Sequence, residues 1–233
     1  MKIFIVTAHL EEKSFNYALS QRAKFFFEKK GHTVVQSNLY QMNWDPNSGR
    51  ENYLSSADST YFKQQAEEQY AFDNNQFNNE ISIELDKLLS SDLLILQFPL
   101  TWCSVPSILK SWIDKVFAFG ATYGNGKWFD NGVLSGKRAL LSLTTGGPST
   151  MYTEQGLNGD LEKILFHLNH GTLRFVGYDI IKPFTSWGVS WCSNEQREKY
   201  LSDYEAYLSN IFEKKPLSYP SLDMYDLNTF ELK

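Results

Sequence analysis

The sequence has little cysteine, no long apolar run and no block of like charge. Its 233 residues include two cysteines, Cys103 and Cys192, which is too few for the disulfide framework of a small secreted domain. The apolar run over residues 2–8 is too short for a signal peptide or a membrane span. The net charge of −5 argues against a nucleic-acid binder. We therefore expect a cytoplasmic protein with no nucleic-acid partner and no membrane insertion.

Aromatic residues are abundant, at 15% of the chain, and 42% of all residues are hydrophobic. This content is enough for a sizeable core, and an excess of aromatic rings also suits a pocket for a flat conjugated ligand. The length fits one large domain with or without an appendage. We predict one domain over residues 1–213 and a C-terminal tail over residues 214–233.

Short apolar runs alternate with helical stretches along the chain. Buried strands are predicted over residues 2–8, 32–39, 92–98, 138–144 and 177–183. Helices are predicted over residues 15–30, 58–69, 81–89, 106–117, 161–170 and 194–212. Ser14 is expected to cap the first helix and Gly31 to end it. The alternation predicts an α/β fold, a doubly wound sheet of five parallel strands flanked by helices, with a polar excursion over residues 41–79.

In an open α/β sheet, ligands bind beyond the carboxyl ends of the strands. The segment after the first strand, residues 9–16, is a candidate phosphate site, because a helix N-terminus offers free N–H groups to an anion. Ser14, Asn16 and His9 would add side-chain donors; the alternative is that Ser14 only caps the helix. Neither GxGxxG nor GxxxxGK[ST] occurs, so a dinucleotide-binding Rossmann site and a P-loop are both unsupported.

Two further segments follow the third and fourth strands, at residues 99–106 and 145–152. Trp102 stands between two prolines that stiffen its loop, and it could lie against a flat ligand or equally be a core residue. Gly146 and Gly147 permit close approach of the backbone to a ligand or form a simple turn. Tyr152 could donate a hydrogen bond to an anionic ring. Together the three segments suit a flavin, which needs backbone donors, an apolar wall and an anion site.

Several of these segments resemble the NAD(P)H:quinone oxidoreductase family, the DT-diaphorase-like flavoproteins. The residues that carry the resemblance are Ala8-His9, Ser14-Phe15-Asn16-Tyr17-Ala18, Gln97-Phe98-Pro99-Leu100-Thr101-Trp102, Val105-Pro106, Thr144-Thr145-Gly146-Gly147, Met151-Tyr152 and Gln155-Gly156. The resemblance implies a flavodoxin-like fold, bound FAD with FMN as the alternative, and a homodimer with two active sites at its interface. It also implies ping-pong hydride transfer from NADPH or NADH to a quinone.

The resemblance also assigns roles to individual residues. Those matching flavin contacts are His9, Ser14, Phe15, Asn16, Pro99, Leu100, Thr101, Trp102, Cys103, Thr144, Thr145, Gly146, Gly147, Tyr152 and Arg197. Those matching the substrate cavity are Trp102, Gly146, Gly147, Tyr123, Asn125, Trp128 and Phe175, with Tyr123 and Phe175 presented by the second subunit. Tyr152 would stabilise charge on the reduced ring, with Asn158 orienting it.

The sequence departs from the best-known members of the family at three of these positions. Asn158 stands where they have a histidine, so a Tyr–His proton relay is absent. Cys103 and Asn125 replace aromatic residues, which makes the expected substrate wall smaller and more polar. His167 and His170 form an HxxH pair, but a metal site would need further ligands, and we predict no metal.

Two other functions fit a protein of this resemblance. One is a regulatory flavoprotein subunit of a potassium-efflux transporter, since some relatives activate such transporters. The other is a one-electron carrier of the flavodoxin type, although the first loop lacks a short Thr/Ser/Gly phosphate cradle.

Overall fold

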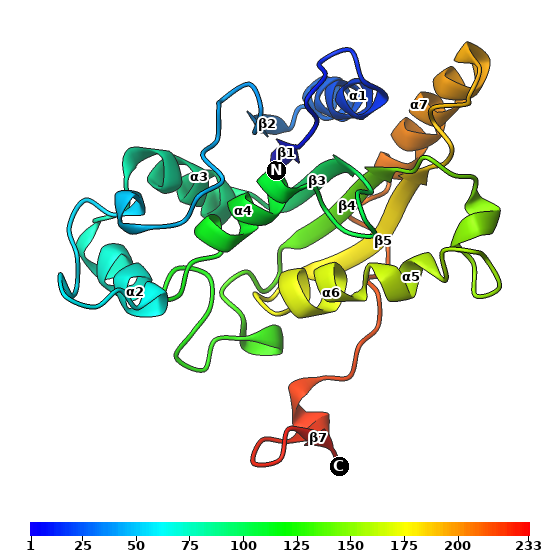
Figure 1. The fold of residues 1–233 in the computed structure, drawn as a ribbon. Coiled ribbons are helices and arrows are strands. Elements are labelled where there is room, and N and C mark those ends of the chain that lie inside the picture. Colours follow the sequence, from blue (N-terminus) through cyan, green and yellow to red (C-terminus); the bar gives the residue numbers. More distant parts are fainter.

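The computed structural model describes all of residues 1–233 and has a five-stranded parallel sheet at its centre (Figure 1). The strands are β1 (Lys2–Thr7), β2 (Thr33–Asn38), β3 (Leu93–Pro99), β4 (Arg138–Thr144) and β5 (Asp179–Ser186). Their spatial order is β2-β1-β3-β4-β5, and every neighbouring pair is parallel. The predicted doubly wound sheet is therefore confirmed, and its strand order reverses direction between β1 and β3.

Helices cover both faces of this sheet. They are α1 (Phe15–Lys29), α2 (Gln64–Asn74), α3 (Asn79–Ser90), α4 (Ser107–Val116), α5 (Leu161–Ile164), α6 (Phe166–Leu168) and α7 (Asn194–Leu208). In Figure 1, α1 and α7 lie on one side of the sheet, and α5, α6 and the C-terminal tail lie on the other. Side chains of α1 and α7 share a core of 13 buried residues, while α3, α4 and the chain around α5 and α6 share a larger one of 33.

The local sequence explains where the first helix begins and ends. The Ser14 hydroxyl accepts a hydrogen bond from the amide of Tyr17, so it caps α1 as predicted. Gly31 follows the helix with φ +81°, a left-handed conformation that glycine adopts without steric cost. Because β1 and β2 are parallel neighbours, this helix crosses over the sheet and places its N-terminus at the carboxyl end of β1.

The structure differs from the predicted elements around β5 and in three helices. β5 continues past Pro183 to Ser186 through a shift in its register with β4 between Leu140 and Ser142. Proline has no N–H to donate, but β5 is an edge strand and a bulge accommodates it there. The helix predicted over residues 161–170 is divided into α5, α6 and a π-helical turn at Asn169–Arg174. The last helix ends at Leu208 rather than residue 212, and α2 begins at Gln64 rather than residue 58 and ends at Asn74 rather than residue 69.

The polar excursion packs against the α3–α4 side of the molecule. Trp44 is buried and donates a hydrogen bond from its indole N–H to the Ser111 hydroxyl on α4, at 2.9 Å. The C-terminal tail returns to the body through the amide of Leu217, which donates to the Ile180 carbonyl of β5. The chain then ends in a two-stranded antiparallel hairpin, β6 (Tyr225–Asp226) and β7 (Glu231–Leu232).

Candidate active site

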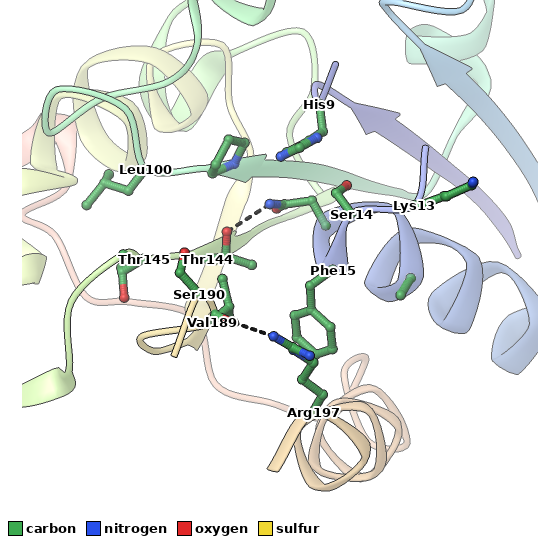
Figure 2. Close-up of a pocket in the computed structure, with 14 residues that line it drawn as sticks. His9, Lys13, Ser14, Phe15, Leu100, Thr144, Thr145, Val189, Ser190 and Arg197 are labelled. Atoms are coloured by element: carbon green, nitrogen blue, oxygen red, sulfur yellow. Dashed lines mark hydrogen bonds between the residues drawn. The ribbon is translucent and has the colours of Figure 1, made fainter. Parts of the chain in front are cut away.

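A cavity of about 520 Å³ opens at the carboxyl ends of the parallel strands (Figure 2). It lies where sheet topology predicts a ligand, since β1 and β3 are the neighbours at which the strand order reverses. Its walls come from four separate segments of the chain. The lining residues are His9, Lys13, Ser14, Phe15, Asn16, Ala18, Pro99, Leu100, Thr144, Thr145, Gly146, Val189, Ser190 and Arg197. Ten of the fifteen flavin-contact positions predicted from the sequence are therefore brought together in one cavity.

The first wall is the N-terminus of α1. The amides of Phe15 and Asn16, the first two residues of the helix, donate no hydrogen bond within the chain. The Nδ1 atom of His9 accepts the amide of Glu11 at 3.0 Å, which leaves its Nε2 as the donor. Lys13 adds a cation beside these groups. Free N–H groups, a helix dipole and a lysine make this wall suited to a phosphate.

Hydrogen bonds between three side chains connect the first wall to the cavity floor, which consists of the buried residues Asn16, Thr144 and Thr145. Gln97, on β3, donates its amide N–H to Asn16 Oδ1 at 2.9 Å. Asn16 in turn donates from Nδ2 to the Thr144 hydroxyl oxygen at 2.8 Å, a bond drawn as a dashed line in Figure 2. All three side chains are almost completely buried. Gln97 was part of a resembling segment, but its place in this chain of bonds was not predicted.

The loop after β3 carries the most exposed aromatic side chain of the site. Thr101 and Ser104 exchange two backbone hydrogen bonds of 2.9 Å around Trp102 and Cys103. Both central residues have positive φ, 49° and 58°, in a turn position that ordinarily favours Asn-Gly. The Trp102 side chain is 97% exposed, so it is not a core residue. An exposed tryptophan on a strained turn is typical of a residue that contacts a ligand or partner.

Thr101, Trp102 and Cys103 stand outside the cavity, beyond the rim formed by Pro99 and Leu100. The Ser104 hydroxyl holds the loop, lying 3.0 Å from Nε2 of His167. His167 Nδ1 lies 2.9 Å from the Ile164 carbonyl, which can only accept. In the neutral imidazole Nδ1 therefore carries the proton, and Ser104 donates to Nε2. The turn is thus tied to α6 through His167.

The loop after β4 presents unused backbone donors. The Thr145 hydroxyl donates to the Gly147 carbonyl at 2.7 Å and holds the turn, while the amides of Gly146 and Gly147 have no partner within the chain. A Cβ added to Gly146 would meet nothing within 4 Å, so this stretch faces open space. Amides in this arrangement can donate to the polar edge of a ring or to an anion.

Tyr152 lies just outside the cavity, behind Gly147. Its ring packs on Trp187, with centroids 5.5 Å apart, and it is half-buried. Its hydroxyl makes no hydrogen bond within the chain, and none joins it to the exposed Asn158. Asn158 instead closes the loop through its backbone, donating to the Met151 carbonyl at 2.9 Å. A Cβ on Gly156 would lie 2.5 Å from that carbonyl oxygen, so the loop can close only with glycine there.

Sequence reasoning missed the wall contributed by the segment after β5. Val189 and Ser190 line the cavity there, and the Arg197 guanidinium donates to the Val189 carbonyl at 3.3 Å and to Asn194 Oδ1 at 3.1 Å. Figure 2 shows Arg197 on α7 directed at Val189, near Phe15. The available signal was the fifth strand itself, because its carboxyl end lies on the same edge of the sheet as those of β1, β3 and β4. Lys13 was missed within a segment that had been singled out.

The aromatic residues predicted for the substrate cavity, Tyr123, Trp128 and Phe175, form a separate aromatic wall. Phe175 packs edge-to-face on Tyr123 and on Trp128, with centroids 5.4 and 6.3 Å apart. Tyr123 and Phe175 line a second cavity of about 730 Å³ together with Glu68 and Asp114, and none of these residues lines the first. Burial raises the pKa of the Glu68 carboxyl and of the Tyr123 hydroxyl. Asn125 is exposed, with φ 55°, and bonds to Gln69 at 3.1 Å.

The HxxH pair takes part in packing. His170 stacks on Phe166 with centroids 4.8 Å apart, and His167 binds Ser104. Arg174, one turn after His170, donates to Asp130 and to the Pro220 carbonyl of the tail. No group of three or more His, Cys, Asp or Glu side chains could hold a metal ion. No helix has the length and apolar character needed to cross a membrane.

Comparisons with known proteins agree with this architecture. The family model for the flavodoxin-like fold matches residues 1–210. NAD(P)H dehydrogenase [quinone] 1 of Cavia porcellus is 36% identical over 228 residues, covering 97% of this chain and 83% of that protein. The chain belongs to the NAD(P)H:quinone oxidoreductase family. Ribosyldihydronicotinamide dehydrogenase [quinone] of Mus musculus is 40% identical over 218 residues, covering 93% of this chain and 94% of that protein. A solved structure from Klebsiella pneumoniae, 29% identical, superposes with a TM-score of 0.96 over 100% of this chain and 94% of its own.

Within this quinone oxidoreductase family, the departures noted in the sequence all lie outside the strand-end cavity. Cys103, Asn125 and Asn158 are all exposed, whereas the residues of the cavity floor, Asn16, Thr144 and Thr145, are buried. The chain therefore differs from the best-known members in the parts that face outward.

Proposed function

We propose that the protein is a flavin-dependent NAD(P)H:quinone oxidoreductase that transfers two electrons as a hydride. One observation carries the proposal: helix N-terminal amides, an apolar wall and unused loop amides meet in a single cavity at the strand ends. This is the set of donors and surfaces that a flavin requires. Its volume of about 520 Å³ lies within the usual range for cofactor sites.

The donor chemistry of the cavity fits a flavin in three places. The α1 amides with His9 and Lys13 would hold a phosphate. Pro99 and Leu100 would lie along the ring, with the amides of Gly146 and Gly147 at its polar edge. When bound, a flavin supplies the ability to accept a hydride from a reduced nicotinamide and to pass it to a quinone in a ping-pong sequence.

The chain's own contribution to hydride transfer is positioning and charge stabilisation. The stiff turn at Trp102 would exclude water above the ring and orient a flat substrate. The Tyr152 hydroxyl has no partner within the chain, so it is free to donate to negative charge that develops on the ring edge. Asn158 would approach Tyr152 only if its exposed side chain moved, because it makes no such bond here.

We propose FAD as the cofactor, because the cavity extends beyond what a single phosphate needs. Val189, Ser190 and Arg197 line its far end on α7 and the preceding loop. The ring of Phe15, the first residue of α1, extends toward Arg197 (Figure 2) and packs on Tyr200, with centroids 6.3 Å apart. An aromatic and a guanidinium can both cover an adenine.

We also propose that the protein works as a homodimer. Tyr123 and Phe175 of the aromatic wall line a different cavity from the flavin site of the same chain, and Trp128 packs on Phe175. A second copy would bring its aromatic wall against the exposed Trp102 turn and so complete each site. On this basis residues 1–213 form the catalytic domain, and the tail over residues 214–233 supports the aromatic wall.

Anaerobic stopped-flow spectroscopy tests the proposal directly. NADPH, and separately NADH, is mixed with the purified flavin-loaded protein while the visible band of the oxidised flavin is followed. We expect rapid two-electron bleaching that menadione reverses. Bound flavin that neither donor bleaches would contradict a reductase and favour the regulatory function. A stable semiquinone would instead favour a one-electron carrier.

A further inference from the structure

Gln97 is an unusual residue for its position in the sheet. It stands in central strand β3, whose other residues from Leu93 to Phe98 are apolar, and its side chain is completely buried. Its Oε1 atom has no hydrogen-bond partner. Burying a half-satisfied amide in a sheet costs stability that an apolar residue would avoid. We therefore look for the role of Gln97 in the one side-chain hydrogen bond that it makes.

That bond begins a directed chain of three side chains. Gln97 Nε2 donates to Asn16 Oδ1 at 2.9 Å, and Asn16 Nδ2 donates to Thr144 Oγ1 at 2.8 Å. Gln97, Asn16 and Thr144 are 0%, 3% and 2% exposed. With so little solvent present, none of them can exchange its partner for water, and each amide orientation depends on its neighbour.

The orientation of the Gln97 amide follows from which of its polar atoms would be left without a hydrogen-bond partner. An amide has two N–H groups and one carbonyl, and a buried orphan N–H is rarer in proteins than an under-satisfied carbonyl. With Nε2 toward Asn16, Gln97 leaves its carbonyl as the atom without a partner. The reverse direction would leave both of its N–H groups unpaired.

The orientation of Asn16 determines the role of the Thr144 hydroxyl, which is the last group in this series of hydrogen bonds. The Thr144 hydroxyl oxygen accepts from Asn16, and its own hydrogen has no acceptor within the protein. Thr144 lines the proposed flavin site. If Asn16 were turned over, the hydroxyl would donate to Asn16 Oδ1 and the cavity would lose this donor.

We propose that Gln97 is a positioning residue that holds Asn16 in one orientation, so that Thr144 donates a hydrogen bond into the cavity to a flavin acceptor. This inference rests on the proposed function, since it names the flavin as the ligand. It assigns a role in cofactor recognition to a residue that does not line the site.

A double-mutant cycle in flavin binding tests the inference. Gln97→Met keeps the length of the side chain but removes the donor, and Thr144→Val removes the hydroxyl. The dissociation constants of FMN and FAD are measured by fluorescence titration of the apoprotein. We expect each single variant to weaken both flavins about tenfold, the effect of one lost hydrogen bond. In the Thr144→Val background, adding Gln97→Met should change the constant by less than about twofold, because the two residues act through one bond.

Gln97→Glu gives a readout that a structural role would not move. A neutral carboxyl can donate to Asn16 as the amide does, whereas a carboxylate can only accept and would turn Asn16 over. Since burial raises the pKa of a carboxyl group, this variant should bind flavin nearly as well as the wild type at about pH 6. It should lose affinity as the pH rises, while the wild type stays unchanged over the same range.

Ser142→Ala is the matched control. Ser142 pairs with Gln97 in the register of β3 and β4, is equally buried, and has an unpartnered hydroxyl. It should leave both flavin constants unchanged. If the wild-type protein binds flavin but the effects of Gln97→Met and Thr144→Val are additive, the inference is wrong and the proposed function still stands. A wild-type protein that binds neither flavin would overturn the proposed function and the inference with it.

Discussion

The strand-end cavity and the aromatic wall are built in opposite ways. The cavity consists of backbone amides, short polar side chains and Pro99, held beyond the ends of β1, β3, β4 and β5. The wall consists of large rings on loops, where Tyr123, Trp128 and Phe175 pack on one another and Phe230 of the tail packs on Trp128. A sheet fixes donor positions closely, while stacked rings on loops can change size without disturbing the fold. If the proposed function holds, we expect the strand-end cavity to determine cofactor binding and the aromatic wall to determine substrate choice.

Two tryptophans compare the packed framework of sheet and helices with the exposed loop after β3, and the larger effect is expected in the framework. Trp112, on α4, is fully buried, packs edge-to-face on Phe4 and donates from its indole N–H to Glu84 at 2.8 Å. Trp112→Ala should lower the free energy of unfolding by about 4 kcal/mol, the usual cost of truncating a buried tryptophan. Urea unfolding of the apoprotein measures it.

Trp102→Ala is the contrasting variant, since Trp102 is almost fully exposed. Its free energy of unfolding should change by less than about 0.5 kcal/mol, while KM for a quinone rises up to about tenfold through loss of stacking. If Trp102→Ala destabilised the protein as much as Trp112→Ala, the division between framework and loop would be wrong.

Tyr152→Phe tests whether the Tyr152 hydroxyl, just outside the strand-end cavity, takes part in catalysis. The hydroxyl has no partner within the chain and the ring packs on Trp187, so the substitution should leave the fold and the flavin affinity unchanged. Loss of one donor to developing charge should slow flavin reduction by roughly 100-fold. Single-turnover stopped-flow measurement gives the rate, and an unchanged rate would remove Tyr152 from the mechanism.

Arg197→Met sharpens the assignment of the far end of the cavity. The guanidinium is held by Val189 and Asn194, so it is preorganised for a ligand. FAD affinity should fall about tenfold, a typical loss of one charge-assisted bond or stacking contact, while FMN affinity stays the same. Arg22→Met is the control, because Arg22 joins α1 to Glu205 of α7 at 3.1 Å without lining the cavity. Equal losses for FMN and FAD would show that Arg197 does not contact the adenine end.

The framework could be predicted from the sequence because its signals are local. The largely apolar stretches at residues 92–98 and 138–144 have the length typical of buried strands, and Ser14 and Gly31 mark the ends of α1. The position of the cavity then followed from the topology of parallel sheets. The bulge at Pro183 and the π-helical turn at Asn169–Arg174 depend on packing against β4 and the tail, which no local pattern encodes.

The site was predicted less completely for the same reason. Lys13, Val189 and Ser190 carry no motif, and the place of Val189 and Ser190 in the cavity depends on where β5 ends. Within an apolar strand, Gln97 looks like a tolerated polar residue until the bond to Asn16 is seen. Arg197 was reached only through the family resemblance, because a lone arginine on a polar helix has no distinguishing pattern.

The smallest expected effect concerns how the tail supports the aromatic wall. His170 lies between Phe166 and Tyr219 of the tail, with Arg174 nearby. Burial, and then the charge of Arg174, lower the pKa of His170 from its usual 6.5. A lowered pKa means that the folded state favours the neutral ring. Its stabilising contribution is therefore complete above pH 6.5 and is lost as the pH falls through the folded value.

Acidification from pH 7.5 should therefore loosen the tail, and limited proteolysis within residues 214–233 should become faster. We expect the rate of cleavage to rise a few-fold. His170→Phe keeps an aromatic ring but cannot titrate, so its cleavage rate should vary less with pH. His32→Phe is the control: the pKa of His32 is also lowered by burial, but it packs on Phe27 and Phe212, away from the tail hairpin. A His170→Phe variant whose tail still loosens like the wild type on acidification would show that the wall does not depend on the neutral histidine.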